Sequence, residues 1–322
     1  MAPLAFVTGA TGTVGPYLIN TLLTRGYRVR ALVRSPDAYE VPKGVEVIAG
    51  GLHDEASVRR GVEGANVVFH LAALLHINDP RPEVQAQYQV VNVEGTRILV
   101  EAAKQAAVGR FVFFSTISVY GPSSGGKAWE ETDALAPVTL YGQSKKEAES
   151  VVRSVMPSST ILRLAAVYGP QMKGNYPTLA GVLGKGIRFF VGNGRNRRTL
   201  VHTADVAQAS ILAAEHPGAV GETFNVTDGA VHRFDDIARA MQQAMGRRPG
   251  ITYVPASIVR PMLTVAQTLL KAINVRFSGP LLLDKLIEDV AVSGDKLREE
   301  LGFEPHYALT DGWRNTLGAR SS

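Results

Sequence analysis

The sequence predicts an α/β fold with a doubly wound parallel sheet, and three observations carry that prediction. Short runs of β-branched and aromatic residues alternate with amphipathic helical stretches through about half of the chain, a pattern typical of a parallel sheet with helices on both faces. A glycine-rich turn lies between the first of these strands and the first helix. Later strands lead into small and hydroxylated residues, at the sheet edge where open α/β folds bind ligands.

The composition is that of a globular protein with a large core. The chain has 322 residues, of which 45% are hydrophobic, enough for one large α/β domain with a smaller appendage. It has no cysteine, which excludes disulfides, thiolate catalysis and cysteine-ligated zinc, and we predict no metal site. The net charge of +5 is spread along the chain, so we expect no nucleic-acid partner. No apolar stretch is long enough to span a membrane and no secretory leader precedes Leu4, so we expect a cytoplasmic protein.

The first strand and helix enclose a turn that predicts a dinucleotide site. Residues 3–8 form a strand by composition, and the apolar periodicity of residues 17–23 predicts the helix that follows. Glycines at this junction let the backbone turn tightly and approach a pyrophosphate, which then lies at the helix N-terminus. The spacing is GxxGxxG rather than the commoner GxGxxG. The cofactor-binding residues predicted here are Gly9, Thr11, Gly12, Thr13, Val14 and Gly15.

The second predicted strand, residues 27–33, ends at Arg34, which bears on the choice of cofactor. In dinucleotide-binding folds an acidic residue near this point binds the ribose hydroxyls, whereas an arginine accommodates a 2′-phosphate. Arg34 therefore favours NADP(H). The nearby Asp37 keeps NAD(H) open.

The middle of the chain continues the alternation. Strands are predicted at residues 45–48, 66–71, 110–114 and 159–164, and helices at 55–62, 84–107 and 138–155. Small residues after the strand at 66–71 leave room for a cofactor at the sheet edge. His70 in that strand is interpreted as a packed residue rather than a ligand. The cofactor contacts predicted at this edge are Leu71, Ala72, Ala73 and Val167.

Tyr141 and Lys145 lie four residues apart in the helix predicted at residues 138–155. On a helix this spacing puts both side chains on one face, their Cβ atoms roughly 6 Å apart. A nearby ammonium favours the phenolate, so we expect Lys145 to lower the pKa of Tyr141 from about 10 toward working pH. Such a pair predicts acid/base work on an alcohol oxygen. A Tyr and a Lys at this spacing are also typical of an ordinary helix whose face runs from the core edge to solvent. The motifs elsewhere in the chain are what support the catalytic interpretation.

Beyond residue 170 the alternation ends. A glycine- and arginine-rich loop covers residues 192–198, and helices are predicted at 234–245, 258–273 and 293–301. Ser293 is predicted to cap the last of these helices and Gly302 to stop it. Residues 276–286 are apolar but interrupted by a Gly-Pro pair.

With the glycine turn, the Ser-Thr-x-x-x-Tyr-Gly sequence from Ser115 and the Tyr-x-x-x-Lys sequence from Tyr141 in this order, the chain resembles the extended short-chain dehydrogenases/reductases, the NAD(P)-dependent epimerase/dehydratase family. The resemblance covers essentially the whole chain. It implies a Rossmann-type doubly wound parallel sheet followed by a smaller, partly interleaved C-terminal substrate domain. The implied division gives residues 1–166 and 198–230 to the dinucleotide-binding domain, and 167–197 and 231–318 to the substrate domain.

The resemblance also implies roles for single residues. Tyr141 falls on the catalytic tyrosine, Lys145 on the lysine that also binds the nicotinamide ribose, and Thr116 on the hydroxyl that orients the substrate oxygen. Gly51 stands where many relatives carry an adenine-binding Asp, so adenine contacts fall to the backbone around Leu52. In the family, the helices matching 84–107 and 138–155 pair across a four-helix interface, so we expect a homodimer.

The second half is similar to bacterial reductases and epimerases that act on the C4 position of nucleotide-linked sugars. Arg198 falls on an arginine that binds the nucleotide diphosphate in those relatives. The substrate residues that the resemblance implies are Thr116, Ser118, Asn175 and Arg198. Two features differ: Ala166 replaces an Asn that contacts the diphosphate in the epimerases, and the apolar stretch 258–286 resembles relatives that act on steroid-like ketones.

We therefore expect an NADP(H)-preferring oxidoreductase that acts on a nucleotide-linked keto-sugar. Three alternatives stay open. The first is a reductase or dehydrogenase of a hydrophobic ketone or alcohol, and the second is a nucleotide-sugar 4-epimerase that uses the same residues and a tightly held NAD. The third is a non-catalytic NADP(H)-binding regulator, since a fold does not fix a function.

Overall fold

The computed structural model describes residues 2–36, 42–75, 82–123, 126–272 and 287–318. Within these residues seven parallel strands form one sheet in the order β11-β6-β5-β4-β1-β2-β3, which confirms the predicted fold class. The strands are β1 (Leu4–Thr8), β2 (Arg28–Val33), β3 (Val45–Ala49), β4 (Val67–His70), β5 (Arg110–Thr116), β6 (Thr160–Leu164) and β11 (Thr223–Val226).

The strand order reverses between β1 and β4, because the chain builds outward to β3 and then crosses back. Thr8 at the end of β1 pairs with His70 at the end of β4. In doubly wound sheets, ligands bind in the crevice beyond the carboxyl ends of the strands at such a reversal. The glycine turn follows Thr8 directly and therefore lies at this crevice.

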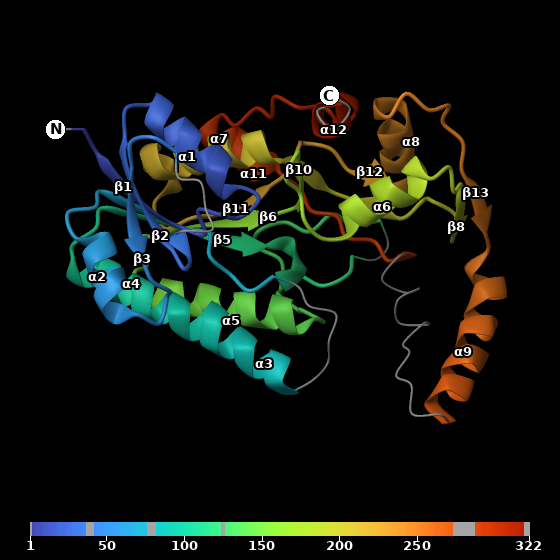
Figure 1. The fold of residues 1–322 in the computed structure, drawn as a ribbon, viewed down its shortest axis with the longest axis horizontal. Coiled ribbons are helices and arrows are strands. Elements are labelled where there is room, and N and C mark those ends of the chain that lie inside the picture. Colours follow the sequence, from blue (N-terminus) through green and yellow to red (C-terminus); the bar gives the residue numbers. More distant parts are fainter. Residues whose placement is uncertain (1, 37–41, 76–81, 124–125, 273–286, 319–322) are drawn as a thin grey trace.

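Helices cover both faces of the sheet (Figure 1). One face carries α1 (Gly15–Thr24), α7 (Thr203–Glu215) and α11 (Asp295–Leu301), and the other carries α2 (Glu55–Val62), α4 (Gly95–Gln105) and α5 (Leu140–Val155). Successive strand residues point to opposite faces, so the side chains of β1 pack into two different hydrophobic cores. Ala5 and Val7 pack into the first, and Leu4 and Phe6 into the second.

Residues 84–107, predicted as one helix, form three consecutive helical segments. These are α3 (Pro82–Tyr88), a π-helical turn η2 (Gln89–Glu94) and then α4. Gly95, the first residue of α4, lies against Leu52: a Cβ at this position would be 2.9 Å from the Leu52 Cβ. The helix therefore approaches the segment after β3 closely at the point where the π turn ends.

The second half of the chain forms smaller units. β7 pairs with β10, β8 with β13, and β9 with β12, while α6, α8 and α12 surround a separate core that includes Tyr168 and Trp313. β11 returns to the large sheet beside β6. The bounds are β7 (Ala166–Tyr168), α6 (Asn175–Gly184), β8 (Phe189–Val191), β9 (Arg197–Arg198), β10 (Leu200–His202), the 3-10 turn η4 (Pro217–Ala219), β12 (His232–Arg233), α8 (Phe234–Ala244), β13 (Thr252–Val254) and α12 (Leu309–Gly318).

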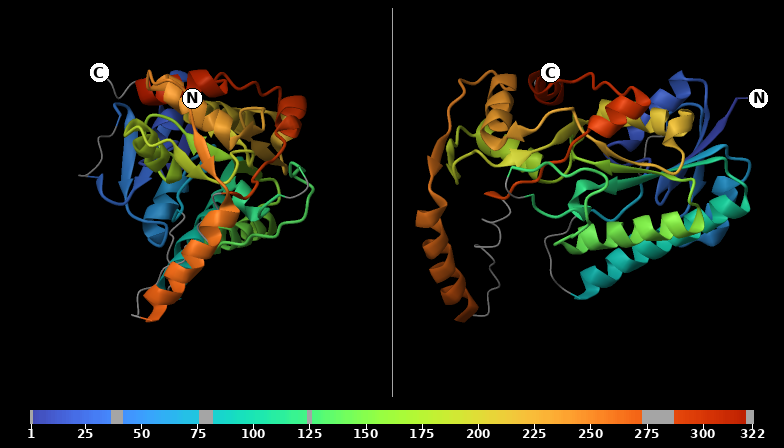
Figure 2. Two further views of the ribbon diagram at one scale, coloured as in Figure 1. Left: turned by 90° about the vertical axis from the view of Figure 1, so that its right-hand side faces the viewer. Right: turned by 180° about the vertical axis from the view of Figure 1, so that it is seen from behind.

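The predicted helix at 258–273 is found as α9 (Ala256–Ala272), which extends away from the body of the molecule (Figure 1, Figure 2). The apolar stretch 276–286 lies outside the described residues. In the described part of the chain, no helix combines the length and the apolar character that crossing a membrane requires.

The last predicted helix, α11, begins later than expected. Its N-cap position is Gly294 rather than Ser293, although the Ser293 Oγ accepts a 3.1 Å hydrogen bond from the backbone N–H of Asp295. The predicted stop is confirmed, since Gly302 ends the helix with a φ of 66°, a left-handed conformation that favours glycine.

Candidate active site

The glycine turn is shaped to admit a pyrophosphate. A Cβ on Gly9 would lie 2.7 Å from the backbone nitrogen of Ala72, and a Cβ on Gly15 would overlap the carbonyl oxygen of Ala10. The turn therefore folds back on itself and against the end of β4. Behind it α1 begins without a side-chain cap and without an acidic residue in its first turn. Its free N–H groups and positive dipole end suit an anion, so the predicted glycine-turn residues fit a dinucleotide.

The other predicted cofactor residues line the same edge of the sheet. Arg34 is exposed at the end of β2, and a Cβ on Gly51 would lie 4.0 Å from its Cγ. Leu52 is only 7% exposed and packs in the core, so it can meet an adenine through its backbone alone. The half-buried residues that follow β4, together with one in β7, are Leu71, Ala72, Ala73 and Val167.

Thr116 is the last residue of β5 and the N-cap of a short 3-10 turn, η3 (Ile117–Val119). Its Oγ1 accepts a 3.2 Å hydrogen bond from the Ser118 N–H, lies 3.2 Å from the Ser118 Oγ, and shares a hydrogen bond with the Tyr141 phenol. Gly142 allows this approach, because a Cβ there would lie 2.6 Å from the Ser118 carbonyl oxygen. The structure thus brings Thr116, Ser118 and Tyr141 together.

Lys145 lies one helical turn beyond Tyr141 and is only 1% exposed. Its Nζ sits 4.0 Å from the centroid of the Phe113 ring. Burial lowers the pKa of Lys145 to about 7, against the opposing effect of the Glu149 carboxylate. A group whose protonated and neutral forms are both populated near neutral pH is suited to proton transfer.

The prediction that Lys145 lowers the pKa of Tyr141 is wrong. Burial raises the pKa of Tyr141 to about 12, the nearby phenol of Tyr88 adds to the rise, and the bond from Thr116 opposes it. Loss of hydration is the largest effect on this pKa, while the Lys145 Nζ lies over the Phe113 ring and burial disfavours its charged form. At neutral pH Tyr141 therefore carries its proton and is a proton donor.

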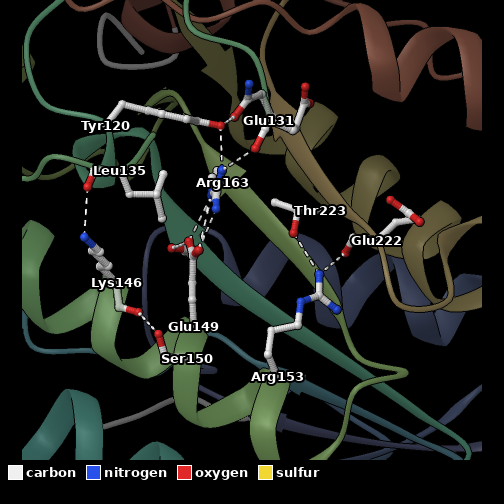
Figure 3. A network of polar contacts seen from close by, with 12 residues as sticks. Tyr120, Glu131, Leu135, Lys146, Glu149, Ser150, Arg153, Arg163, Glu222 and Thr223 are labelled. Atoms are coloured by element: carbon white, nitrogen blue, oxygen red, sulfur yellow. Dashed lines mark hydrogen bonds and ion pairs between the residues drawn. The ribbon is translucent and has the colours of Figure 1, made fainter. Parts of the chain in front are cut away.

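Ser115, the neighbour of Thr116, belongs to a different network. Its Oγ donates a 2.5 Å hydrogen bond to Glu149, whose carboxylate forms a buried ion pair with Arg163 at 2.8 Å. Figure 3 shows Arg163 between Glu149 and Tyr120, with which it also bonds at 2.7 Å. This network ties β5, β6 and α5 together behind the site, and it explains why Thr116 rather than Ser115 faces Tyr141.

The predicted substrate residues Asn175 and Arg198 lie in the smaller unit, on α6 and β9. Asn175 is the exposed first residue of α6, and Arg198 is half-buried on β9. Burial raises the pKa of Tyr176 to about 12, and the charge of Arg198 opposes this rise, which places Arg198 near the start of α6.

Three neighbours of the Tyr141–Lys145 helix face escaped prediction. Glu149 lies four residues after Lys145 and therefore on the same helix face, a spacing that could have identified it. Tyr88, whose ring centroid is 6.3 Å from that of Tyr141, and Asn92, in the π turn, come from a helix that the sequence presents as regular. Among the described residues, no group of three or more His, Cys, Asp or Glu side chains is arranged to hold a metal.

An uncharacterised protein from Sinorhizobium fredii is 30% identical over 98% of this chain and 94% of its own length. A UDP-glucose 4-epimerase from Vibrio cholerae is 29% identical, covering 97% of this chain and 94% of its own. A 4-hydroxy-2-methyl-3-oxo-4-farnesyl-3,4-dihydroquinoline-1-oxide ketoreductase from Stigmatella aurantiaca is 28% identical, covering 92% and 91%.

Among solved structures, the UDP-glucose 4-epimerase of Thermus thermophilus in complex with NAD superposes with a TM-score of 0.76 at 26% identity, covering 98% of each chain. The family model described as the NAD dependent epimerase/dehydratase family matches residues 5–227. That match spans the sheet, the glycine turn and the Tyr141–Lys145 pair. The chain therefore belongs to the NAD dependent epimerase/dehydratase family, the extended short-chain dehydrogenases/reductases, whose members are oxidoreductases and epimerases.

Proposed function

We propose that this enzyme is an NADP(H)-preferring reductase of a carbonyl group on a nucleotide-linked sugar. The observation that carries the reductive direction is the protonated phenol of Tyr141 hydrogen-bonded to Thr116. A carbonyl oxygen placed between these two hydroxyls would be held by both. The same oxygen could then take its proton from Tyr141.

Thr116, Tyr141 and Lys145 each have a different role in the proposed reaction. A bound nicotinamide dinucleotide would supply the hydride for the carbonyl carbon. Thr116 orients the carbonyl oxygen, and Tyr141 gives its proton to that oxygen as negative charge develops there. The products are an alcohol and the oxidised nicotinamide. Lys145 stabilises the tyrosinate left behind, and solvent then restores its proton.

The preference for NADP(H) rests on Arg34. This side chain is exposed at the end of β2 and next to Gly51, a position that leaves space for a 2′-phosphate. A guanidinium can bind a phosphate through two parallel hydrogen bonds.

The sugar-nucleotide substrate rests on Arg198 and the start of α6. The two lie close enough for the Arg198 charge to act on Tyr176, and α6 begins without a side-chain cap. An arginine beside uncapped helical N–H groups suits a diphosphate. The similar epimerase from Vibrio cholerae, by its name, acts on UDP-glucose.

A hydrophobic ketone is the second candidate. It is favoured by Ala166, by the exposed side chains of Ile258 (57%) and Met262 (68%) on α9, and by the similarity to a ketoreductase whose named substrate carries a farnesyl group. Such a substrate has no diphosphate for Arg198 to bind.

One variant separates the two candidates. Arg198→Ala should weaken binding of a nucleotide sugar roughly tenfold or more, because a charge-assisted bond contributes about 1.5–3 kcal/mol. The Michaelis constant for a neutral ketone should hardly change. Arg59→Ala, which removes an exposed arginine on the remote helix α2, is the control. Efficient turnover of neutral ketones by the Arg198→Ala enzyme, with no nucleotide sugar accepted by the wild type, would replace the first candidate by the second.

We also propose that the enzyme is a homodimer with two-fold symmetry, the commonest closed arrangement. Its interface would be formed by α4 and α5, which lie side by side on the face of the sheet that also carries α2 (Figure 1). Light scattering at micromolar protein tests this, and a monomer mass would contradict it.

A further inference from the structure

His70 lies fully buried at the reversal of strand order and is bonded on both ring nitrogens. Its Nδ1 lies 2.8 Å from the Thr8 Oγ1, and its Nε2 lies 2.8 Å from the Thr96 Oγ1. Thr8 precedes the glycine turn directly, and Thr96 is the second residue of α4, just after the π turn. The imidazole therefore connects the cofactor turn to the irregular helix beside the catalytic residues.

The directions of these hydrogen bonds follow from the partners at each end. Thr96 Oγ1 donates a 2.6 Å bond to the carbonyl oxygen of Asn92, which can only accept. The hydroxyl proton of Thr96 is thus committed, so His70 must donate to it through Nε2–H. His70 Nδ1 then carries a lone pair and accepts from Thr8. The Thr8 oxygen in turn accepts a 3.3 Å bond from the Ala72 N–H.

This order requires a neutral imidazole. A proton on Nδ1 would reverse this bond, because Thr8 would then have to turn its hydroxyl proton away and accept from His70. Burial, aided by the charge of Lys145, holds the pKa of His70 well below its usual value. At neutral pH the ring is therefore uncharged and held in this one tautomer.

The network continues from Asn92 to the catalytic helix. The Asn92 Oδ1 accepts a 2.7 Å bond from the Leu74 N–H, and its Nδ2 donates to the Leu74 carbonyl at 3.1 Å and to the Ser144 Oγ at 3.0 Å. Ser144 donates a 2.9 Å bond to the carbonyl oxygen of Tyr141. A π turn shifts the side chains that follow it relative to a regular helix, and such turns are frequent at functional sites. Here it coincides with the point where Asn92 reaches both Leu74 and α5.

We propose that His70 is a positioning residue with two separable tasks: through Thr8 it fixes the glycine turn and the Leu71–Ala73 segment for the dinucleotide, and through Thr96 and Asn92 it fixes the helix that carries Tyr141. This inference rests on the proposed dinucleotide-dependent function. The first task acts on cofactor binding and the second on turnover.

Two matched threonine variants separate the tasks. Thr8→Val and Thr96→Val each replace one buried hydroxyl by a methyl group and break one side of the His70 network. Thr8→Val should raise the dissociation constant of NADP(H), measured by calorimetry, about tenfold with little change in kcat, the loss of about one buried hydrogen bond. Thr96→Val should lower kcat by a similar, about tenfold, factor while the dissociation constant stays near that of the wild type.

Thr160→Val is the control for stability. Thr160 is also buried, and its Oγ1 donates a 2.6 Å bond to the Ala219 carbonyl at the opposite end of the sheet. Loss of this hydrogen bond should lower the unfolding temperature about as much as Thr8→Val and Thr96→Val do. It should change neither the dissociation constant of NADP(H) nor kcat. The three variants together distinguish positioning from stability alone.

Substitutions of His70 give an independent test that does not depend on the threonine variants folding. In His70→Asn the amide oxygen can accept from Thr8 and no donor reaches Thr96, so NADP(H) binding should be retained and kcat reduced. In His70→Gln the amide nitrogen can donate to Thr96 and no acceptor serves Thr8, so the opposite pattern is expected. Variants that match Thr160→Val in both readouts, or that change both readouts by one common factor, overturn the inference. A wild-type enzyme that binds neither NADP(H) nor NAD(H) would instead overturn the proposed function.

Discussion

Ser115 donates a 2.5 Å hydrogen bond to the carboxylate of Glu149, while its neighbour Thr116, at the end of β5, shares a hydrogen bond with Tyr141. Adjacent side chains of a strand point in different directions, and the two hydroxyls of the Ser-Thr pair meet two different residues of α5. Ser115 holds the end of β5 to α5 through Glu149, and Arg163 completes the buried charge pair (Figure 3). Thr116 is thereby left to bond with Tyr141.

Removing the charge of Glu149 should destabilise the protein strongly. Both partners of the Glu149–Arg163 pair are buried, with side-chain exposures of 6% and 7%. Glu149→Gln leaves an uncompensated guanidinium in the interior, which costs about 3–5 kcal/mol of unfolding free energy. Urea denaturation measures the loss.

Glu147→Gln is the matched control for Glu149→Gln. It makes the same change two residues earlier on α5, at an exposed position, and should alter the unfolding free energy by less than about 0.5 kcal/mol. Equal effects of the two substitutions would contradict a structural role for the buried pair.

Tyr141→Phe keeps the aromatic ring and removes the donated proton. Turnover should fall by the ~100- to 10,000-fold typical of a lost general acid. Binding of NADP(H) should barely change, because the ring still fills its place against Tyr88. Steady-state kinetics and calorimetry on the same preparation check both statements, and near-wild-type turnover would remove Tyr141 from the catalytic role.

Much of the fold could be predicted because its signals are local. The helix predicted at 55–62 has the bounds of α2, where Asp54 caps the first turn through its bond from the Ser57 N–H. The Tyr141–Lys145 helix was likewise predicted, with Thr139 capping it through a bond from the Gly142 N–H. Caps and periodicity need no knowledge of the rest of the chain.

The remaining features depend on tertiary contacts. The π turn before Gly95 cannot be read from a 3.6-residue period, because it accompanies the packing of that glycine on Leu52 and the bond from His70 to Thr96. The pKa of Tyr141 depends on how deeply the fold buries it. Strands of two or three residues, such as β9, are too short to show alternation in the sequence.

Cofactor choice can be tested at Arg34. Arg34→Asp places a carboxylate where the proposal puts the 2′-phosphate, so it should weaken NADP(H) binding and relatively favour NAD(H). Calorimetric titration of both cofactors measures the ratio of their dissociation constants. Arg28→Asp, at an exposed position at the other end of the same strand, is the control and should leave that ratio unchanged. The same ratio in wild type and Arg34→Asp would remove Arg34 from the site.

Lys145 should give the protein a distinctive dependence of stability on pH. Burial lowers its pKa in the folded chain to about 7 from an ordinary 10.5. Between these values the unfolded chain binds more protons than the folded chain, so the unfolding free energy rises with pH. The sign follows from the buried charge: its cost is present in full below pH 7 and is relieved as the pH rises above the folded pKa.

Lys145→Met removes this titration and keeps a side chain of similar length. Relative to that variant, the wild type should gain on the order of 1 kcal/mol of unfolding free energy per pH unit between about pH 7.5 and 9.5, the slope for one proton. Urea denaturation at several pH values measures it. Lys146→Met, at the exposed neighbouring position, should keep the wild-type slope. If the Lys145→Met and wild-type curves run parallel, Lys145 stays charged in the folded enzyme, and the carboxylate of Glu149 four residues away then outweighs the loss of hydration.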